Sequence, residues 1–513
     1  MSASQEKKRR REERAEGVDK KTVVKNKTAK AKKRTRTIAA IVAIVLVVVV
    51  LFLVVMNSSL FYSQVPALRV GSHSFTADEY NYFYQNALYT EYNRIYQSMG
   101  EYTSYFLDLT KPLSEQTCTY DSSMTWADYI ADQTMKGIRE TVSLSDAAKA
   151  EGYTLTAEDQ ATIEENISST KDSATSGGAS FKSYLSSAYG RGFTEANYRE
   201  LVTEQVMAVS YRDVLLDRWE SGYTDTLLAD KYEEIADQYD LLSYCYYFVS
   251  GAADDENGID ADTAMNAAYD TAQTIAAGKT EEVFLELVQQ TLTEEEQANY
   301  ADVDSILRAN VSAQSLSSSD YYDWLVDAAR AYGDTTVVEG TNGYYVLLFV
   351  GRNHNDYALR SFRHILVQVE TGDEVDSGAA TLAAQSEANT LYEQWQEDPT
   401  EDNFAEMANA NSDDGGSNTK GGLYEDVQYG QMVKPIEDWL FDEARQPGDS
   451  TVVYASNSNY SGYHIVYYVG EEDHNYNLDL ATTAQQNDDY AAWLEEKEPS
   501  YPIQKLFAFR FTK

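Results

Sequence analysis

Apolar residues follow two patterns in the first half of the chain: one unbroken run, and then helical spacing. The run spans residues 38–56, which are 19 positions without a charged or strongly polar side chain. Beyond it, apolar residues three and four positions apart predict amphipathic helices. These helices are expected at 77–98, 126–151, 157–168, 195–217 and 226–238. We therefore expect a helical lobe at 57–238, opened by a short strand pair within 68–75.

From residue 239 onward, short apolar strands alternate with helices and the chain repeats itself. Residues 323–339 and 438–454 match at 11 of 17 positions. Each segment is followed by a predicted strand that contains Gly-Tyr, at residues 343–344 in the first copy and 462–463 in the second. Self-similarity of this kind indicates copies of one structural unit. The sequence thus predicts two α+β domains, at 239–353 and 357–471, followed by a C-terminal extension at 472–513.

The apolar run has the length and the flanking charges of a membrane anchor. A helix of this length rises about 28 Å, close to the hydrocarbon thickness of a bilayer. Residues 1–36 carry 15 Lys and Arg against 5 Asp and Glu, and such a basic tail stays in the cytoplasm. A cleaved signal peptide is the competing interpretation, although residues 56–59 make a poor cleavage site. We expect a transmembrane helix at 37–56 and the bulk of the chain outside the cell.

The rest of the chain is strongly acidic, with 26 Lys and Arg against 78 Asp and Glu after residue 36. A surface with this charge repels phosphates, so nucleic acid is excluded as a partner. A disulfide between the two cysteines, Cys118 and Cys245, is one interpretation if the chain lies outside the cell. Cys245 falls in a strand-like apolar run, however, which favours two buried thiols.

The second α+β unit carries a series of short segments that resembles the parvulin family of peptidyl-prolyl isomerases. In chain order they lie at 363–367, 403–408, 411–414, 420–423, 430–437 and 461–466. The resemblance implies a four-stranded antiparallel sheet wrapped by helices, with a small pocket for proline. The helical lobe is similar to the chaperone region of PrsA- and SurA-type foldases, through residues 70–71, the helix after Thr76, 125–129 and 151–156.

The resemblance also implies roles for single residues. His364 and His464 match the paired histidines at the pocket floor, and Asp414 matches a position that is Cys or Asp in the family. Ser461 matches the hydroxyl beside the second histidine. The residues implied to bind the substrate, mainly as the apolar wall around the proline ring, are Leu423, Met432, Ile436 and Phe441. Family members usually have Phe where Ile436 stands.

These residue types suit rotation about an Xaa-Pro bond. The conjugated amide opposes rotation with a barrier of about 18–20 kcal/mol. A catalyst needs an apolar pocket for the ring and a polar network shaped to the twisted amide, and it needs no covalent bond. No cofactor is expected. A metal is not expected either, because the sequence shows no short-spaced ligand pair such as HxxxH or CxxC.

The first α+β unit departs from the pattern at the positions that matter for this chemistry. Tyr246 and Tyr345 stand where the second copy has its histidines, and residues 299–319 lack the Gly-Gly-Leu and Gly-Gln-Met segments. We therefore expect a folded but non-catalytic domain. The whole chain is expected to be an isomerase and chaperone for unfolded exported proteins with Xaa-Pro segments. The alternative is a weak or inactive holdase or scaffold that uses both domains only to bind clients.

Overall fold

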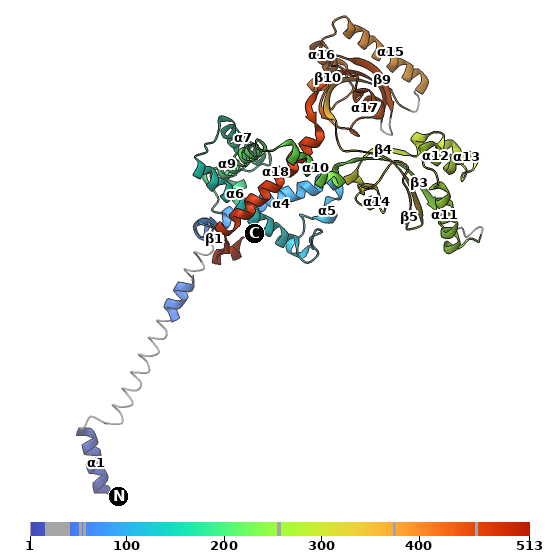
Figure 1. Ribbon diagram of the computed structural model, residues 1–513. Coiled ribbons are helices and arrows are strands. Elements are labelled where there is room, and N and C mark those ends of the chain that lie inside the picture. The colour runs from blue at the N-terminus through green and yellow to red at the C-terminus, as the bar shows by residue number, and fades with distance from the viewer. Residues whose placement is uncertain are drawn as a thin grey trace. The chain divides into compact units, whose positions relative to one another are not determined.

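The computed structural model describes residues 2–15, 42–50, 54, 58–253, 258–372, 376–456 and 460–512. The chain forms two units (Figure 1). One holds Met1–Trp219 together with Asp489–Lys513, and the other holds Glu220–Asp488.

The predicted anchor falls partly outside the described residues. Residues 42–50 and 54 are helical, whereas 37–41, 51–53, 55 and 56 are not described. The basic tail begins with α1 (Ala3–Ala15), and its residues 16–36 are likewise not described. Within the described part of the chain, no helix has both the length and the apolar character needed to cross a membrane.

Three long helices of the first unit begin in the same way. They are α4 (Ala77–Met99), α6 (Trp126–Glu151) and α7 (Ala157–Ser176). At α4, the Thr76 hydroxyl accepts the N–H of Glu79, and the Glu79 carboxylate accepts the N–H of Thr76. The other two helices repeat this capping box. It satisfies N–H groups that a helix start leaves unpaired, and so fixes where each helix begins.

The described residues of this unit also form α3 (Ser59–Gln64), α5 (Thr103–Phe106), α8 (Phe181–Ala188) and α9 (Glu195–Glu220). The helices predicted at 77–98, 126–151, 157–168 and 195–217 are confirmed. The helix predicted at 226–238 is also confirmed, as α10 (Asp225–Tyr239), but the structure groups it with the second unit.

A three-stranded antiparallel sheet joins distant parts of the sequence within the first unit. β1 (Pro66–Val70) pairs with β2 (His73–Thr76), which confirms the predicted strand pair. β1 pairs on its other side with β11 (Ile503–Lys505). The C-terminal segment, expected only as an extension, therefore completes the sheet of the helical lobe, and α18 (Tyr476–Lys497) leads the chain to it.

Aromatic side chains fill the core of the first unit. The ring of Tyr82 stacks on Phe193 with 6.0 Å between centroids and meets Tyr189 edge-on at 5.3 Å. Its hydroxyl donates to Gln205, as a buried tyrosine requires. Other tyrosines of this unit are exposed at the surface: Tyr89, Tyr96, Tyr102 and Tyr105.

Two four-stranded antiparallel sheets with the same strand order form the second unit. The first sheet, ordered β4-β3-β6-β5, consists of β3 (Leu241–Ser250), β4 (Leu307–Ser312), β5 (Thr335–Gly340) and β6 (Gly343–Asn353). The second sheet, ordered β8-β7-β10-β9, consists of β7 (Ala358–Gln368), β8 (Leu423–Val427), β9 (Ser450–Ser456) and β10 (Ser461–Asn475). The internal repeat is thus confirmed as two copies of one fold.

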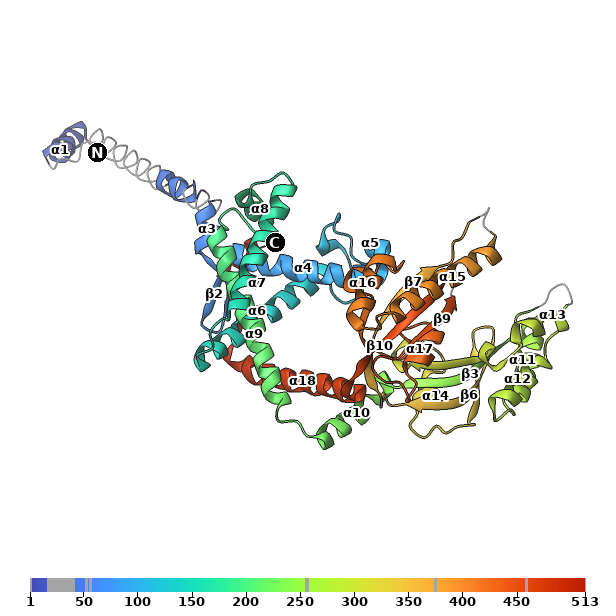
Figure 2. The same cartoon turned by 90° about the horizontal axis from the view of Figure 1, so that it is seen from above.

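Each of these sheets packs helices on both faces (Figure 1, Figure 2). The first sheet carries α11 (Ala261–Ile275) and α12 (Glu281–Gln289) on one face and α14 (Tyr322–Val326) on the other. The second sheet carries α15 (Ser377–Gln396) and α16 (Glu401–Asn411) on one face and α17 (Lys434–Leu440) on the other. Leu325 of α14 and Leu440 of α17 are fully buried at matching places. Strand alternation explains the arrangement, because successive side chains enter different cores.

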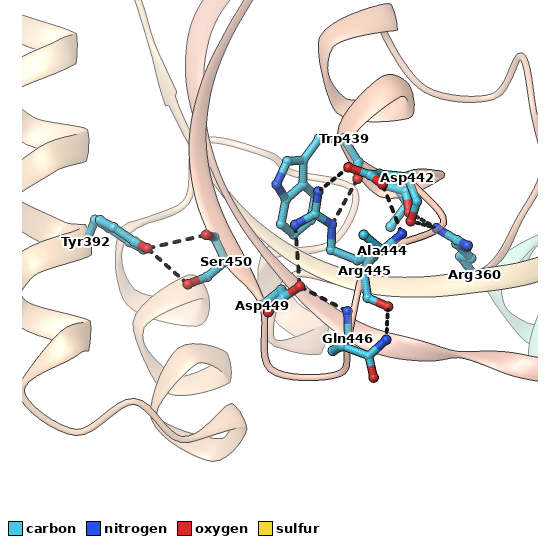
Figure 3. A network of polar contacts seen from close by, with 10 residues as sticks. Arg360, Tyr392, Trp439, Asp442, Ala444, Arg445, Gln446, Asp449 and Ser450 are labelled. Carbon is cyan, nitrogen blue, oxygen red and sulfur yellow. Dashed lines mark hydrogen bonds and ion pairs between the residues drawn. The ribbon is translucent and has the colours of Figure 1, made fainter.

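The segment that repeats most closely forms a polar cluster beside the second sheet (Figure 3). The Arg445 guanidinium lies 4.1 Å from the centre of the Trp439 ring. It also donates to the carbonyl oxygen of Trp439 at 3.1 Å and to the carboxylates of Asp442 and Asp449 at 3.4 Å each. Arginine suits this place because its planar group stacks on an aromatic face while its N–H groups reach several acceptors.

The first copy builds the same cluster. Arg330 lies 4.6 Å from the centre of the Trp324 ring and pairs with Asp327 at 2.7 Å and with Asp334 at 3.5 Å. The glycine that precedes Asp334 and its counterpart have positive φ angles of 87° and 96°. The residues shared by the two copies are therefore those that hold the turn between the helix and the next strand.

Both cysteines are free and buried, Cys118 in the first unit and Cys245 in the second. The interpretation as two buried thiols is confirmed.

Candidate active site

The pairing of β7 with β10 brings the two histidines together. His364 lies opposite Val466, and His464 lies opposite Leu366, so the histidines occupy diagonal positions on one face. Their rings stack with 5.4 Å between centroids and 11° between planes, and their Nδ1 atoms are 3.1 Å apart. His364 is 6% exposed and His464 is 1% exposed. The pair is thus buried and in direct contact.

Asp414 holds one end of this pair. Its Oδ2 lies 2.9 Å from Nε2 of His364 and accepts the hydroxyls of Ser417 and Tyr424. Its Oδ1 accepts the N–H of Gly416 at 3.2 Å. The hydrogen bond with His364, supported by the Ser417 and Gly416 bonds, lowers the pKa of Asp414. Asp414 is therefore ionised near neutral pH and acts only as an acceptor.

The ionised carboxylate sets the direction of the hydrogen bonds. A carboxylate has no proton to give, so His364 donates its Nε2–H to Asp414. Burial, and then the neighbouring His364, lowers the pKa of His464 to about 4, which keeps His464 neutral at pH 7. When both rings are neutral, Nδ1–H of His464 donates to Nδ1 of His364. Nε2 of His464 then remains an acceptor, 3.4 Å from the Tyr460 hydroxyl.

The loop that carries Asp414 is fastened to β7. The Ser412 hydroxyl accepts the N–H of Leu366 at 3.1 Å and the N–H of Asp414 at 3.3 Å. Asp413 donates its N–H to the Leu366 carbonyl at 2.9 Å, and its carboxylate accepts the N–H of Gln368 at 2.9 Å. These bonds fix Asp414 at the distance that His364 requires.

Glycines let the other end of this loop approach β7. His364 donates its N–H to the Gly422 carbonyl at 2.9 Å. Gly421 and Gly422 have φ angles of 68° and 70°, which favour glycine. A Cβ on Gly422 would stand 2.2 Å from the His364 carbonyl oxygen. The Gly-Gly pair is therefore required by close backbone contact with the histidine strand.

The structure brings most of the predicted proline wall together. Met432, Ile436 and Phe441 belong to one apolar cluster with Phe362, whose ring lies 5.9 Å from that of His364. Ile436 is 2% exposed. Leu423 stands apart from this cluster, at the start of β8 and opposite Arg363 in the strand pairing.

Ser461 lies on the face of the sheet away from the histidines. Side chains alternate along β10, so Ser461 and Tyr463 point away from the face of His464. Tyr463 packs in the core formed with α15 and α16. Among the contacts of the described residues, none joins the Ser461 hydroxyl to either histidine.

Sequence reasoning missed three hydroxyl residues of the site: Ser417, Tyr424 and Tyr460. Ser417 is 1% exposed and donates to Asp414. The Tyr424 ring lies 5.3 Å from that of His364, and burial together with Asp414 raises the pKa of Tyr424 to about 12. Two of these residues could have been found from their closeness in sequence to predicted site residues. Ser417 lies three residues after Asp414, and Tyr460 lies four residues before His464.

The first sheet places a tyrosine pair at the same positions. Tyr246 lies opposite Leu347, and Tyr345 lies opposite Phe248, so the two occupy the diagonal arrangement of the histidines. Their ring centroids are 6.0 Å apart. The predicted alignment of the copies is confirmed at these two positions.

A four-stranded antiparallel sheet with helices on both faces, and a buried His-His-Asp chain on it, is the arrangement expected of a parvulin-type isomerase domain. Residues 364–470 match the family model described as "Rotamase: PPIC-type PPIASE domain". The resemblance is thereby confirmed for this segment: it is a PPIC-type peptidyl-prolyl isomerase domain, and the chain that carries it is a peptidyl-prolyl isomerase.

Comparisons over longer stretches find distant similarity. No curated protein matches the chain. The crystal structure of the peptidylprolyl isomerase PrsA from Bacillus anthracis is 15% identical, covers 45% of this chain and 86% of its own, and has a TM-score of 0.19. The foldase protein PrsA from Streptococcus pneumoniae str. Canada MDR_19A is 11% identical, covers 74% and 88%, and has a TM-score of 0.27. At these values the likeness carries no argument about function.

Proposed function

We propose that this isomerase works outside the cytoplasm as a chaperone for exported proteins, held at the membrane by residues 37–56. The observation that carries the proposal is the hydrogen-bonded chain of His464, His364 and Asp414 inside the segment that matches the isomerase family model. In this proposal the histidines and Asp414 form the polar network, and Met432 and Ile436 contribute to the proline wall.

The proposed site acts on the Xaa-Pro amide without covalent chemistry. Rotation breaks the conjugation that gives the amide its barrier of about 18–20 kcal/mol. A twisted amide gains a more basic nitrogen and a less polarised carbonyl, so a fixed polar network complementary to that form lowers the barrier. Nε2 of His464 and the Tyr460 hydroxyl lie at the end of this hydrogen-bonded series that is opposite Asp414. Asp414 accepts bonds from four groups and therefore acts as a positioning residue.

A hollow in the helical lobe supports the chaperone part of the proposal. It has a volume of about 880 Å³ and is lined by Tyr198, Val202 and Val209 together with Asp213, Asp217 and others. A mixed lining of tyrosine and valine with polar and acidic side chains suits an extended segment of an unfolded chain, especially one that carries basic residues.

The extracytoplasmic location is supported by the charge step and the apolar run. Residues 1–36 are basic and the remainder is strongly acidic, which matches the positive-inside rule. Protease added to intact cells that express the chain should digest residues 57–513. Protection of the whole chain in intact cells, with digestion after lysis, would contradict this location.

The catalytic assignment is tested by replacing the histidines one at a time. His364→Ala and His464→Ala should each lower the rate of Xaa-Pro isomerisation by about tenfold or more, measured with a protease-coupled peptide assay. Circular dichroism checks that each variant is folded. His474→Ala is the control, since His474 lies on the same strand but binds Asp473 and Asp479 instead. Full activity in both folded variants would place the site elsewhere.

Ile436 favours a second function, a holdase with little turnover. An aliphatic side chain at this buried wall position offers no flat ring to the proline. If the holdase function holds, the unmodified chain suppresses aggregation of an unfolded reference protein but gives no isomerisation above the uncatalysed rate.

A further inference from the structure

The tyrosine pair of the first sheet belongs to a larger aromatic cluster. Tyr321, just before α14, meets both members: its ring lies 6.0 Å from Tyr246 and 5.3 Å from Tyr345. All three side chains are half-buried, so part of each ring remains accessible. The ring of Tyr345 also lies against Gly340, where a Cβ would stand 2.8 Å from it. The cluster is thus a partly open aromatic surface.

Tyr321 stands at the place of a proline-wall residue in the second copy. It lies two residues before Asp323, as Ile436 lies two residues before Asp438, in the segments that match between the copies. The first copy therefore keeps a wall residue here, and that residue is aromatic. Residues 299–319 still lack the Gly-Gly-Leu and Gly-Gln-Met segments of the second copy, so the other wall positions have no such match.

The neighbouring strand follows the same correspondence. Tyr244 lies opposite Arg308 in the first sheet, as Phe362 lies opposite Tyr424 in the second. Tyr424 reaches the histidine pair, and Arg308 in turn places its guanidinium 5.6 Å from the centre of the Tyr246 ring. The cluster thus matches the site of the second copy at the two histidines, Ile436 and Tyr424, with three aromatic rings and a cation at these positions.

We propose that Tyr246, Tyr321 and Tyr345 bind proline in extended segments of unfolded proteins and hold it without isomerising it. Flat aromatic rings pack against the proline ring and against the extended helix that proline-rich segments adopt, at low cost in conformational entropy. The inference rests on the proposed function, because both sites would bind proline-containing segments of the same unfolded proteins. It adds a second proline site with a separate role.

Charge selects among such segments. Residues 239–353 carry 20 Asp and Glu against 4 Lys and Arg. An acidic surface attracts basic partners and repels acidic ones. Arg308 is a cation at the cluster itself, but the surrounding domain is acidic, so the occupant is a proline-containing segment whose flanking residues are Lys or Arg.

The test uses the full-length chain and a photo-crosslinkable peptide with two prolines flanked by lysines. Cross-links mapped by mass spectrometry are expected in β3, β6 and residues 319–324. Tyr246→Ser with Tyr345→Ser should weaken labelling of these segments by about tenfold, as loss of a central aromatic contact does. The two Phe replacements should retain it. Tyr344→Ser is the matched control, because Tyr344 packs against Tyr269 on the opposite face, and it should retain labelling.

Two outcomes would overturn the proposal: cross-links confined to residues 364–470, or equal labelling by a peptide with alanine in place of both prolines. Isomerisation is measured on the same samples and should be unchanged by the two serine replacements. Absence of turnover in the unmodified chain would count against the proposed function, whereas unlabelled tyrosines with normal turnover would count against this inference alone.

Discussion

Lowering the pH from 8 to 5 should destabilise the sheet β8-β7-β10-β9 and spare the sheet β4-β3-β6-β5. His464 is 1% exposed, and burial together with His364 lowers the pKa of His464 from 6.5 to about 4. Between these values the unfolded chain binds a proton that the folded chain does not. Stability is therefore full above pH 6.5 and falls as the pH decreases toward 4.

The size of the effect follows from the two pKa values. Their difference sets a ceiling of about 3 kcal/mol, and the linkage relation gives a loss of about 2 kcal/mol between pH 8 and pH 5. Asp414 adds little to the pH dependence between pH 8 and pH 5. Its pKa is lowered in the folded chain, so its contribution to stability begins to fall only near pH 3.8, the pKa of Asp in the unfolded chain. Asp473 and Asp479 raise the pKa of His474. The contribution of His474 to folding stability is therefore full below pH 6.5 and is lost as the pH rises, which is opposite in sign to that of His464.

Hydrogen exchange on the full-length chain resolves the two sheets separately. After correction for intrinsic rates, protection of β7 and β10 should fall by up to about thirtyfold between pH 8 and pH 5, because His474 acts in the opposite direction to His464. Protection of β3 and β6 should not fall, because the tyrosines at the matching positions do not titrate in this range. His464→Gln should remove the extra pH dependence of β7 and β10. An equal loss in both sheets, or an unchanged dependence in His464→Gln, would refute the reasoning.

Other predictions concern the loop and the first copy. Asp414→Asn should lower isomerisation by about tenfold in a folded protein, because an amide no longer accepts all four bonds of the carboxylate; normal activity in the peptide assay would contradict this. Gly422→Ala should destabilise the domain in urea denaturation by about 2 kcal/mol or more, since its Cβ meets the backbone of His364. Gly415→Ala, with open space around it, should not. Tyr246→His with Tyr345→His should create no isomerase activity in the first copy. The pair is tested in a chain that also carries Asp414→Asn, which weakens the second site. The residual isomerisation rate of that chain should not rise when the two histidines are added.

The parts of the fold that the sequence predicts are those with a local cause. Capping boxes and helical spacing are read within a few residues, so most helices of the lobe begin where expected. The tandem domains were evident because Trp439, Asp442 and Arg445 interact with one another over a short stretch, and the first copy uses the same residues. Because these interacting residues lie close together in sequence, both copies keep them in one short segment, and the repeat can be recognised there.

The parts that were missed depend on pairing between distant segments. β11 joins β1 from the far end of the chain, and no short-range pattern announces that pairing. Tyr424 enters the site because β8 pairs with β7. Ser461 shows the opposite case, since its place beside the second histidine in the family pattern suggested contact, while strand alternation turns it to the other face.

The two copies separate the residues that make the fold from those that make the site. The matched residues hold α14 or α17 and the turn after it, and the first copy keeps them without any histidine at the site. The loop of the second copy, in contrast, is fastened to β7 through Ser412 and Gly422 and delivers Asp414 to His364. The corresponding stretch of the first copy holds α13 (Glu294–Gln297) and short 3-10 turns instead. The loop, as much as the histidines, therefore makes the second copy an isomerase domain, because it sets the ionised acceptor that orients both rings.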